Sequence, residues 1–353
     1  MKIKVSYCTL LLMTLLVVAI RYVPGAGEWY ATQIYPYTSA ALSWISSWVP
    51  FSLDECVALL GIFLLIMTLV QGIRDSWRWY KTVGKMAMLG LTYIVWFYLG
   101  WGCNYFRDNF YQRMLVAPAE ADKEVFMDFA TTFVDSLNTN WERVYPYEGH
   151  CAYELNKEEV IDEIKEIYKQ APALSGLCTP QEYQQPKNML INWLYSASGV
   201  LGFVGPWVGE SLLNEQLQPV QYPFTCAHEL SHLLGISGEA EANYWAYAVC
   251  RQSASPFVRY SAYEGLLYHV MVNASMILNE DEYRQWVTSI HPQIIEQQRA
   301  LAQFWQEQRI HWIDELQNVL LDLQLKGNRI PSGKANYSQV VQMVISCPPL
   351  PFE

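Results

Sequence analysis

The stretch TCAHELSHLLGISGEAEANYWAYAVC, residues 225–250, predicts two short helices joined by a tight turn. The turn GISG (235–238) supplies two glycines, which can end one helix and begin the next. In the first helix, His228 and His232 are four positions apart and share one face, so two imidazoles can meet a single ion. A turn this short folds the second helix back across the first, and its N-terminus comes near the histidine pair.

The pentad HELSH (228–232) has the spacing of a catalytic zinc site. Glu229 follows the first histidine and can reach a water molecule on the ion. Zinc lowers the pKa of such a water toward neutrality, and the carboxylate can accept its proton as the water attacks a carbonyl carbon. We therefore predict a Zn²⁺ cofactor with Glu229 as the general base. The alternative interpretation is a core or surface helix in which both histidines are incidental.

The third protein ligand is predicted just after the turn. A histidine at position 238 would complete the pattern HExxHxxGxxH of metzincins, but Gly238 stands there. Glu239 and Glu241 point in different directions on a helix, so only one of them can face the ion. Glu239 shares a face with Asn243, and a carboxylate also suits a helix N-terminus. We predict that Glu239 completes the site with the two histidines, although both glutamates could simply favour the first helical turn.

An oxyanion donor is predicted from the next helical segment, FVRYSAYEGLLYHV (257–270). Stabilising a developing oxyanion requires a donor such as Tyr, His or Arg. Our predicted catalytic residues here are His269 and Tyr260, with Tyr263 and Arg259 as further candidates. For each of the four, the alternative is ordinary packing or surface exposure.

Other polar residues can support or replace the predicted ligands. The second nitrogen of a zinc-bound histidine usually meets a carboxylate or carbonyl, and Asn243 or Glu241 could serve. Glu210 and His150 are alternative metal ligands. The run GVLGFVGPWVGE (199–210) predicts a strand on whose edge an extended peptide could pair, although a plain core strand fits the same pattern.

The N-terminal part of the chain predicts three transmembrane helices, at about 5–23, 55–73 and 86–106. Only 16% of all residues are charged and 52% are hydrophobic, which indicates a membrane component. A net charge of −11 with no basic cluster argues against a nucleic-acid partner, and we expect none. Two lysines precede the first span, and arginines and lysines lie between the second and third, so the positive-inside rule places the N-terminus in the cytoplasm. We expect a multi-pass protein of the bacterial cytoplasmic membrane, with the lipid bilayer as a partner.

The predicted architecture is a membrane domain, residues 1–107, followed by an extracytoplasmic domain, residues 108–353. The second domain is mainly helical, and amphipathic patterns predict helices at 156–170, 258–278 and 292–324. Short apolar runs between glycines predict a small sheet of one or two strands before the HELSH helix. The fold class is therefore mainly α, with three transmembrane helices and an α+β exterior domain.

HELSH followed by EAEAN (239–243) resembles the gluzincin pattern HExxH…ExEA(D/N). That pattern occurs in membrane-embedded CAAX-type and stress-response proteases and in toxin–antitoxin-associated metalloproteases, where the first glutamate of the second motif binds zinc. The resemblance maps this role to Glu239, although the gap between the motifs is much shorter here. The run from Gly202 to Cys250, with RYSAY (259–263), resembles more closely an uncharacterised family of bacterial membrane-anchored HExxH proteins with three N-terminal spans. This resemblance implies a zincin-like exterior domain.

These observations predict a membrane-anchored zinc metallopeptidase that acts on a peptide or protein outside the cytoplasm. An intramembrane protease is disfavoured because residues 210–260 hold too many polar groups to cross lipid. The alternatives are a zinc-containing envelope binding protein without proteolytic activity and a zinc amidase that cleaves a cell-wall amide. Glu229 disfavours the first alternative, because a closed structural site needs no general base. The substrate and the oligomeric state stay open.

Overall fold

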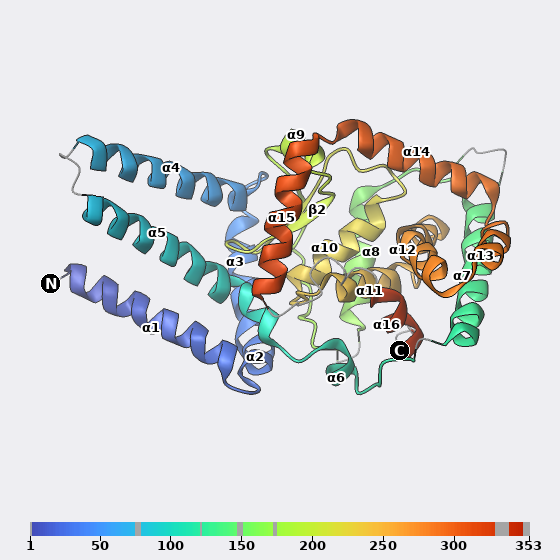
Figure 1. Ribbon diagram of the computed structural model, residues 1–353, viewed down its shortest axis with the longest axis horizontal. Coiled ribbons are helices and arrows are strands. Elements are labelled where there is room, and N and C mark those ends of the chain that lie inside the picture. The colour runs from blue at the N-terminus through green and yellow to red at the C-terminus, as the bar shows by residue number, and fades with distance from the viewer. Residues whose placement is uncertain are drawn as a thin grey trace.

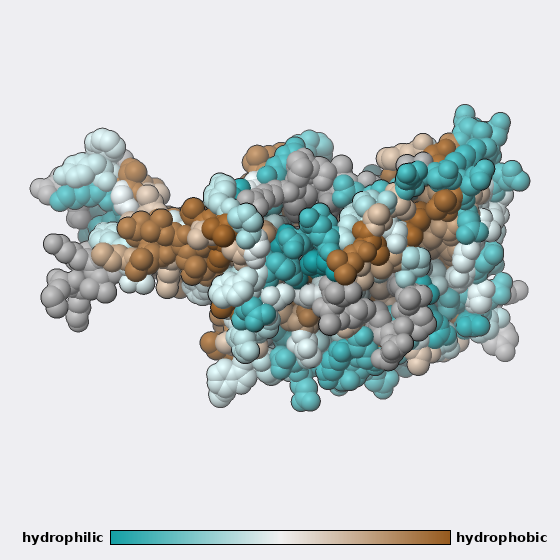
Figure 2. Space-filling model, turned by 90° about the horizontal axis from the view of Figure 1, so that it is seen from below, coloured by the Kyte–Doolittle hydropathy of each residue, from teal (hydrophilic) through white to brown (hydrophobic). Residues whose placement is uncertain are grey.

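The computed structural model describes residues 2–74, 79–120, 122–146, 151–171, 175–328 and 339–348. Three helices lie side by side at one end of the molecule and project away from a larger helical domain (Figure 1). They are α1 (Lys2–Tyr22), α4 (Leu53–Arg74) and α5 (Trp79–Gly100). On the face shown in Figure 2, hydrophobic surface covers much of this projecting part, and the large domain shows mixed hydrophilic and hydrophobic areas.

Among the described residues, α4 and α5 are each long and apolar enough to cross a membrane. The count reaches three if Tyr7–Tyr22 and Ala26–Ser46, which meet at a bend of 118°, are taken as one span. The structure corrects the third predicted span, which occupies Trp79–Gly100 instead of 86–106. Its aromatic end leaves the helix because Gly102–Phe106 form a buried 3₁₀ turn, η2, beside the large domain.

The segment between the first two predicted spans is part of the folded structure and packs against the large domain. It consists of α2 (Ala26–Trp29), the π-helical turn η1 (Tyr30–Ile34) and α3 (Tyr35–Ser46). The hydroxyls of Tyr35 and Ser39 donate to the carbonyl of Leu233, at distances of 2.8 and 3.2 Å. Contacts therefore cross the predicted boundary between the membrane domain and the exterior domain.

The small sheet has three strands in the order β1-β3-β2. Strand β1 (Lys187–Asn188) runs parallel to β3 (Glu210–Leu213), and β2 (Gly202–Gly205) pairs antiparallel to β3 with Gly202 opposite Leu213. The predicted strand at 199–210 is therefore β2, a turn and the first residue of β3. Within the described part of the chain, this order leaves one side of β2 without a neighbouring strand.

The sheet is fastened to the N-terminus of α4 by buried carboxylates. Glu210 accepts hydrogen bonds from the backbone N–H groups of Leu53 and Asp54, which are free at a helix start, and it pairs with Lys187 at 2.6 Å. In return, Asp54 accepts from the backbone of Trp207 at 2.8 Å. A membrane helix and the sheet thus satisfy each other's polar groups.

The core of the large domain is formed where α10 and α11 pack against each other and against neighbouring helices.

The predicted helix at 156–170 is confirmed, with Asn156 capping its start and its apolar face buried. The predicted helix at 292–324 is wrong as one helix: it breaks after Gln308 because the Ile310 N–H bonds to the carbonyl of Ala197. The helices of this domain are α6 (Phe110–Met114), α7 (Lys123–Val144), α8 (Lys157–Lys169), α9 (Asn192–Ala197), α10 (Tyr222–Leu233), α11 (Glu239–Cys250), α12 (Pro256–Ile277), α13 (Glu280–Val287), α14 (Pro292–Gln308), α15 (His311–Gly327) and α16 (Val340–Ser346).

Candidate metal centre

The turn between α10 and α11 brings the predicted ligands together. Gly235 has a φ of +103°, a backbone conformation that residues with a Cβ rarely adopt, and it ends α10. The N–H of Ile236 then returns to the carbonyl of Ser231 at 3.1 Å. Gly238 precedes the first residue of α11, which is Glu239. The short turn therefore directs the start of α11 across the face of α10 that carries the histidines.

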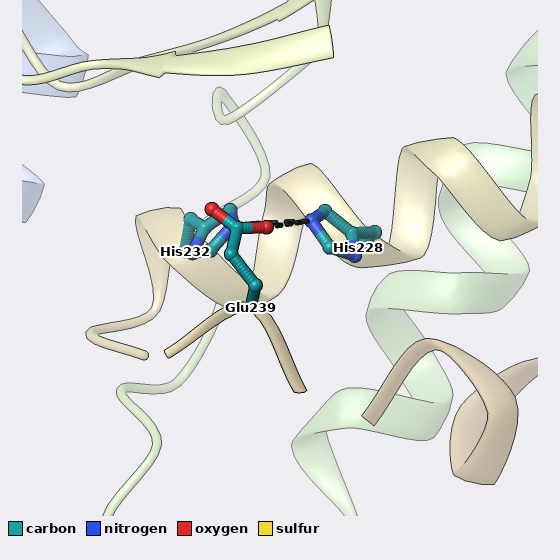
Figure 3. A group of neighbouring side chains, drawn as sticks. All are labelled: His228, His232 and Glu239. Carbon is teal, nitrogen blue, oxygen red and sulfur yellow. Dashed lines mark hydrogen bonds and ion pairs between the residues drawn. The ribbon is translucent and has the colours of Figure 1, made fainter. Parts of the chain in front are cut away.

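His228, His232 and Glu239 place one ligand atom each within 4.8 Å of one another (Figure 3). The two histidine Nε2 atoms are 3.1 Å apart, and a Glu239 oxygen lies 3.2 Å from the first and 3.6 Å from the second. Ligands held tetrahedrally at zinc bond lengths of about 2.0–2.1 Å are separated by roughly 3.3 Å. The three atoms therefore form a triangle of the size that a tetrahedral zinc ion requires on three of its corners.

The other nitrogen of each histidine is held by an acceptor. His228 Nδ1 lies 2.8 Å from Asn243 Oδ1, and His232 Nδ1 lies 2.7 Å from the carbonyl of Ile236. An oxygen acceptor at Nδ1 places a hydrogen there, so the neutral form of each ring has its lone pair on Nε2, the nitrogen nearest the Glu239 carboxylate. Both rings are thus oriented so that, once neutral, they can bind a metal through Nε2. Of the two supporting residues predicted, Asn243 occupies this position.

The electrostatics of the group favour a bound cation. Burial lowers the pKa of His232, but the nearby Glu239 carboxylate outweighs it and raises that pKa to about 9. Burial raises the pKa of Glu239, but the two histidines outweigh it and the pKa falls well below its usual value. A proton on His232 thus balances the carboxylate, and a metal ion would replace this proton when it binds.

Glu229 points away from solvent beside strand β2. Its side chain is buried, and its Oε2 has no hydrogen-bond partner among the described residues. Burial is the main cause that raises its pKa to about 6. A Cβ at Gly202 would lie 2.5 Å from Glu229 Cγ, so only glycine leaves room for this carboxylate. A buried carboxylate with an unused oxygen, next to two histidines and a glutamate, fits a zinc site that carries water.

The carbonyls at the end of α10 are satisfied by residues from the membrane-proximal part of the chain. Trp101 Nε1 donates to the carbonyl of His232 at 2.8 Å, and Arg107 donates to that of Gly235 at 3.0 Å. The His232 carbonyl also accepts from the Gly235 N–H at 3.0 Å, so Trp101 adds a second donor there, and Arg107 pairs with a carbonyl of the turn that follows the helix. Trp101 and Arg107 were not predicted to support the site, although Trp101 belongs to the aromatic end of the third predicted span.

The remaining predicted site residues have other roles. Tyr260 is fully buried, and its hydroxyl donates to Gln297 at 2.6 Å, so this contact gives no support to an oxyanion role. His269 Nε2 lies 3.5 Å from Asn243 Nδ2, which places it behind the partner of His228. Arg259 donates to the carbonyl of Ser253, and Tyr263 packs edge-on against the ring of Tyr247.

The alternative ligands and supporting residues are also engaged elsewhere. Glu241 forms a buried ion pair with Arg113 and accepts from Trp245 Nε1, so it does not hold either histidine. Glu210 binds Lys187 and the start of α4. His150 lies outside the described residues.

A cleft of about 720 Å³, which sequence analysis did not predict, lies beside the first turn of α10. It is bordered by the residues that lead into β2, Gly199 and Leu201, and by Gln221, which precedes α10. Glu264 of α12 is buried in its wall and accepts from Gln298 at 2.7 Å. Burial raises the pKa of Glu264 to about 7. The cleft approaches the edge strand β2, whose Gly202 lies against Glu229.

Comparison with curated proteins and with solved structures gives no match. One family model matches residues 30–345, which include η1, α3, both apolar helices α4 and α5 and the HELSH helix. The chain therefore belongs to the family described as "Protein of unknown function (DUF3810)".

Proposed function

We propose that this protein is a membrane-anchored zinc-dependent metallopeptidase. The observation that carries the proposal is the arrangement of His228, His232 and Glu239, with both Nδ1 atoms engaged and three donor atoms 3.1–3.6 Å apart. Two histidines and one glutamate are a ligand set of catalytic zinc, and they leave a fourth position for water. When bound, zinc supplies a Lewis acid that acidifies this water and polarises a substrate carbonyl.

Glu229 is proposed as the general base. Its Oε2 is available to take a proton from water and to hand it to the leaving amine, since no described residue occupies that atom. A pKa of about 6 suits both transfers near neutral pH. The carboxylate is then mostly ionised and can accept a proton, and its protonated form is only slightly higher in free energy. Gly202 leaves the room that this carboxylate needs. Asn243 holds the ring of His228 in place throughout.

The substrate is proposed to be a peptide in extended conformation. The order β1-β3-β2 leaves the outer edge of β2 available for backbone hydrogen bonds, and Gly202 on this strand touches Glu229. A peptide added to that edge would pass beside the candidate base. The cleft at Gly199 and Leu201 gives room for side chains that precede or follow the cleaved bond.

The orientation is proposed from the charge pattern, with the N-terminus in the cytoplasm and the large domain outside it. The N-terminal end of α1 and the adjoining ends of α4 and α5 lie away from the large domain (Figure 1). This arrangement is compatible with a cytoplasmic position for all three ends. The substrate would then be an extracytoplasmic peptide or protein.

The test uses the purified full-length protein and measures metal content and cleavage separately. We expect about one zinc per chain in the wild type, loss of zinc in the double variant His228→Ala, His232→Ala, and retention of zinc in Glu229→Gln. Cleavage is measured on a mixed peptide library by mass spectrometry, and Glu229→Gln should lower it about 10²–10⁴-fold. Wild-type protein without zinc would refute the site. Undiminished cleavage by Glu229→Gln would refute the mechanism.

A further inference from the structure

Helix α15 (His311–Gly327) has an apolar stripe that faces away from the protein. Its members recur at helical spacing on one side, and each is between 52% and 66% exposed: Trp312, Leu316, Val319, Leu320 and Leu323. Ile313, by contrast, is buried on the protein side. Comparable exposure is found on α4, where Leu60, Ile62 and Phe63 are between 51% and 56% exposed. The stripe therefore has the character of a lipid-facing helix surface.

The C-terminal end of α15 is hydrogen-bonded near the ends of two membrane helices, α1 and α5, that adjoin the large domain. Arg21, in the last turn of α1, donates to the carbonyl of Gly327 at 3.0 Å. Tyr98, near the end of α5, donates to Asn328 at 2.8 Å. These contacts place this end of α15 at the level where α1 and α5 meet the large domain.

The N-terminal end of α15 is held near the N-terminal end of the third membrane helix, α4, which also adjoins the large domain. The N–H of Ile310 bonds to the carbonyl of Ala197, the last residue of α9. The backbone just before α9, at Leu190 and Ile191, donates to Glu55 in the first turn of α4. A helix of 17 residues is about 25 Å long. It therefore crosses from the end of α4 to the ends of α1 and α5, and Figure 1 shows it at a steep angle to them.

We propose that α15 lies flat on the membrane from which the protein projects, with its apolar stripe in the headgroup region of the bilayer. A helix with this position, a tryptophan near one end and leucines along one face is the pattern of an interfacial helix. The charged residues of its other sides are mainly acidic, Asp314, Glu315 and Asp322, against a single Lys326. Attraction to anionic lipid therefore contributes little, and burial of the stripe holds the helix in place.

This position has a consequence for the cleft of about 720 Å³. His311 and Asp314, in the first turn of α15, line that cleft. One rim of the cleft is then at the lipid surface, next to the residues that lead into β2.

The experiment places the photo-crosslinking residue p-benzoylphenylalanine at single positions of the full-length chain. The protein is reconstituted in phosphatidylcholine vesicles that contain alkyne-tagged phosphatidylcholine, and tagged protein is measured after illumination. Leu316 and Leu320 test the stripe, and Leu60 of α4 is the positive control. Met276 is the matched control, because it is equally apolar and exposed but lies in the last turn of α12, which leads into α13 at the far end of the large domain (Figure 1).

We expect lipid adducts at Leu316 and Leu320 in yields similar to Leu60 and several-fold above Met276. The yields should be the same in high salt and without anionic lipid. All four positions are at least half exposed, so the substitutions leave the core unchanged. Yields at Leu316 and Leu320 as low as at Met276 would overturn the proposal. A covalent dimer in place of the lipid adduct would also overturn it and assign the stripe to a second copy of the chain.

Discussion

The hydrogen bond between His228 and Asn243 gives the most direct test of the candidate metal centre. Asn243 Oδ1 lies 2.8 Å from His228 Nδ1 and selects the tautomer whose Nε2 faces Glu239. Asn243→Leu removes this acceptor while it keeps a side chain of similar size. Asn243→Asp keeps an acceptor and adds a negative charge, so it is the matched control. The prediction is that the first variant binds zinc more weakly and the second binds it at least as tightly as the wild type.

The expected loss of zinc affinity in Asn243→Leu follows from the burial of the hydrogen-bonded pair Asn243 and His228. Asn243 is 5% exposed, so an unpaired Nδ1–H cannot turn to water and costs about 1–3 kcal/mol. Since each 1.4 kcal/mol is a factor of ten, the zinc dissociation constant should rise about 10- to 100-fold. This is also the range found when outer partners of metal-binding histidines are removed. Loss of the ligand itself in His228→Ala should weaken binding further.

The assay is competition for zinc between the full-length protein in detergent and a chromophoric chelator. The unfolding temperature of each metal-free variant is measured in parallel, so that a general loss of folding is recognised separately. The reasoning is refuted if Asn243→Leu, folded as the wild type, binds zinc with unchanged affinity while His228→Ala does not. It is also refuted if Asn243→Asp weakens binding as much as Asn243→Leu.

Two further changes test the surroundings of the site. Gly202→Ala brings a Cβ to 2.5 Å from Glu229 Cγ and displaces that carboxylate, so cleavage of the peptide library should fall about a hundredfold while zinc content stays unchanged. Burial raises the pKa of Glu264 from 4.5 to about 7, so the folded state binds the proton of this carboxyl more tightly than the unfolded state does. The wild-type protein therefore loses unfolding free energy as the pH rises from about 4.5 to 7. Glu264→Gln should therefore match the wild type in unfolding free energy near pH 4 and exceed it by up to about 3 kcal/mol at pH 8, whereas Glu296→Gln, at an exposed position, should show no such difference.

The sequence was most informative where the determinants are local. Two histidines four apart, a glycine-bounded turn and a glutamate at the next helix start are all within twelve residues, and the structure brings these side chains together. Helical periodicity and a capping Asn156 likewise located α8. In these segments, backbone geometry alone relates sequence spacing to position in space.

The predictions were less successful where contacts between residues far apart in the sequence determine the structure. Residues 292–324 read as one helix, but the chain turns at Ile310 to pair with Ala197, more than a hundred positions earlier. Tyr260 has the residue type of an oxyanion donor and stays a prediction, but its hydroxyl donates to Gln297 in a different helix, a contact that residue type alone does not reveal. The third predicted span was displaced toward 106 because Trp101 and its neighbours are as apolar as a membrane helix. In the structure they are buried among residues of α1, η1 and α3, and Trp101 also contacts His232 of α10.

The same long-range contacts explain why the predicted boundary at residue 107 does not separate two independent parts. Carbonyls at the end of α10 and in the turn that follows it accept from Tyr35, Trp101 and Arg107, all of which belong to residues 1–107. Without these donors, the helix end that carries His232 and its turn would lose three hydrogen bonds, each worth about 1 kcal/mol. The family model, which begins at residue 30, includes all of these donors. The membrane-proximal segments are therefore structural components of the candidate site, and they fix the position of its second histidine relative to the membrane helices.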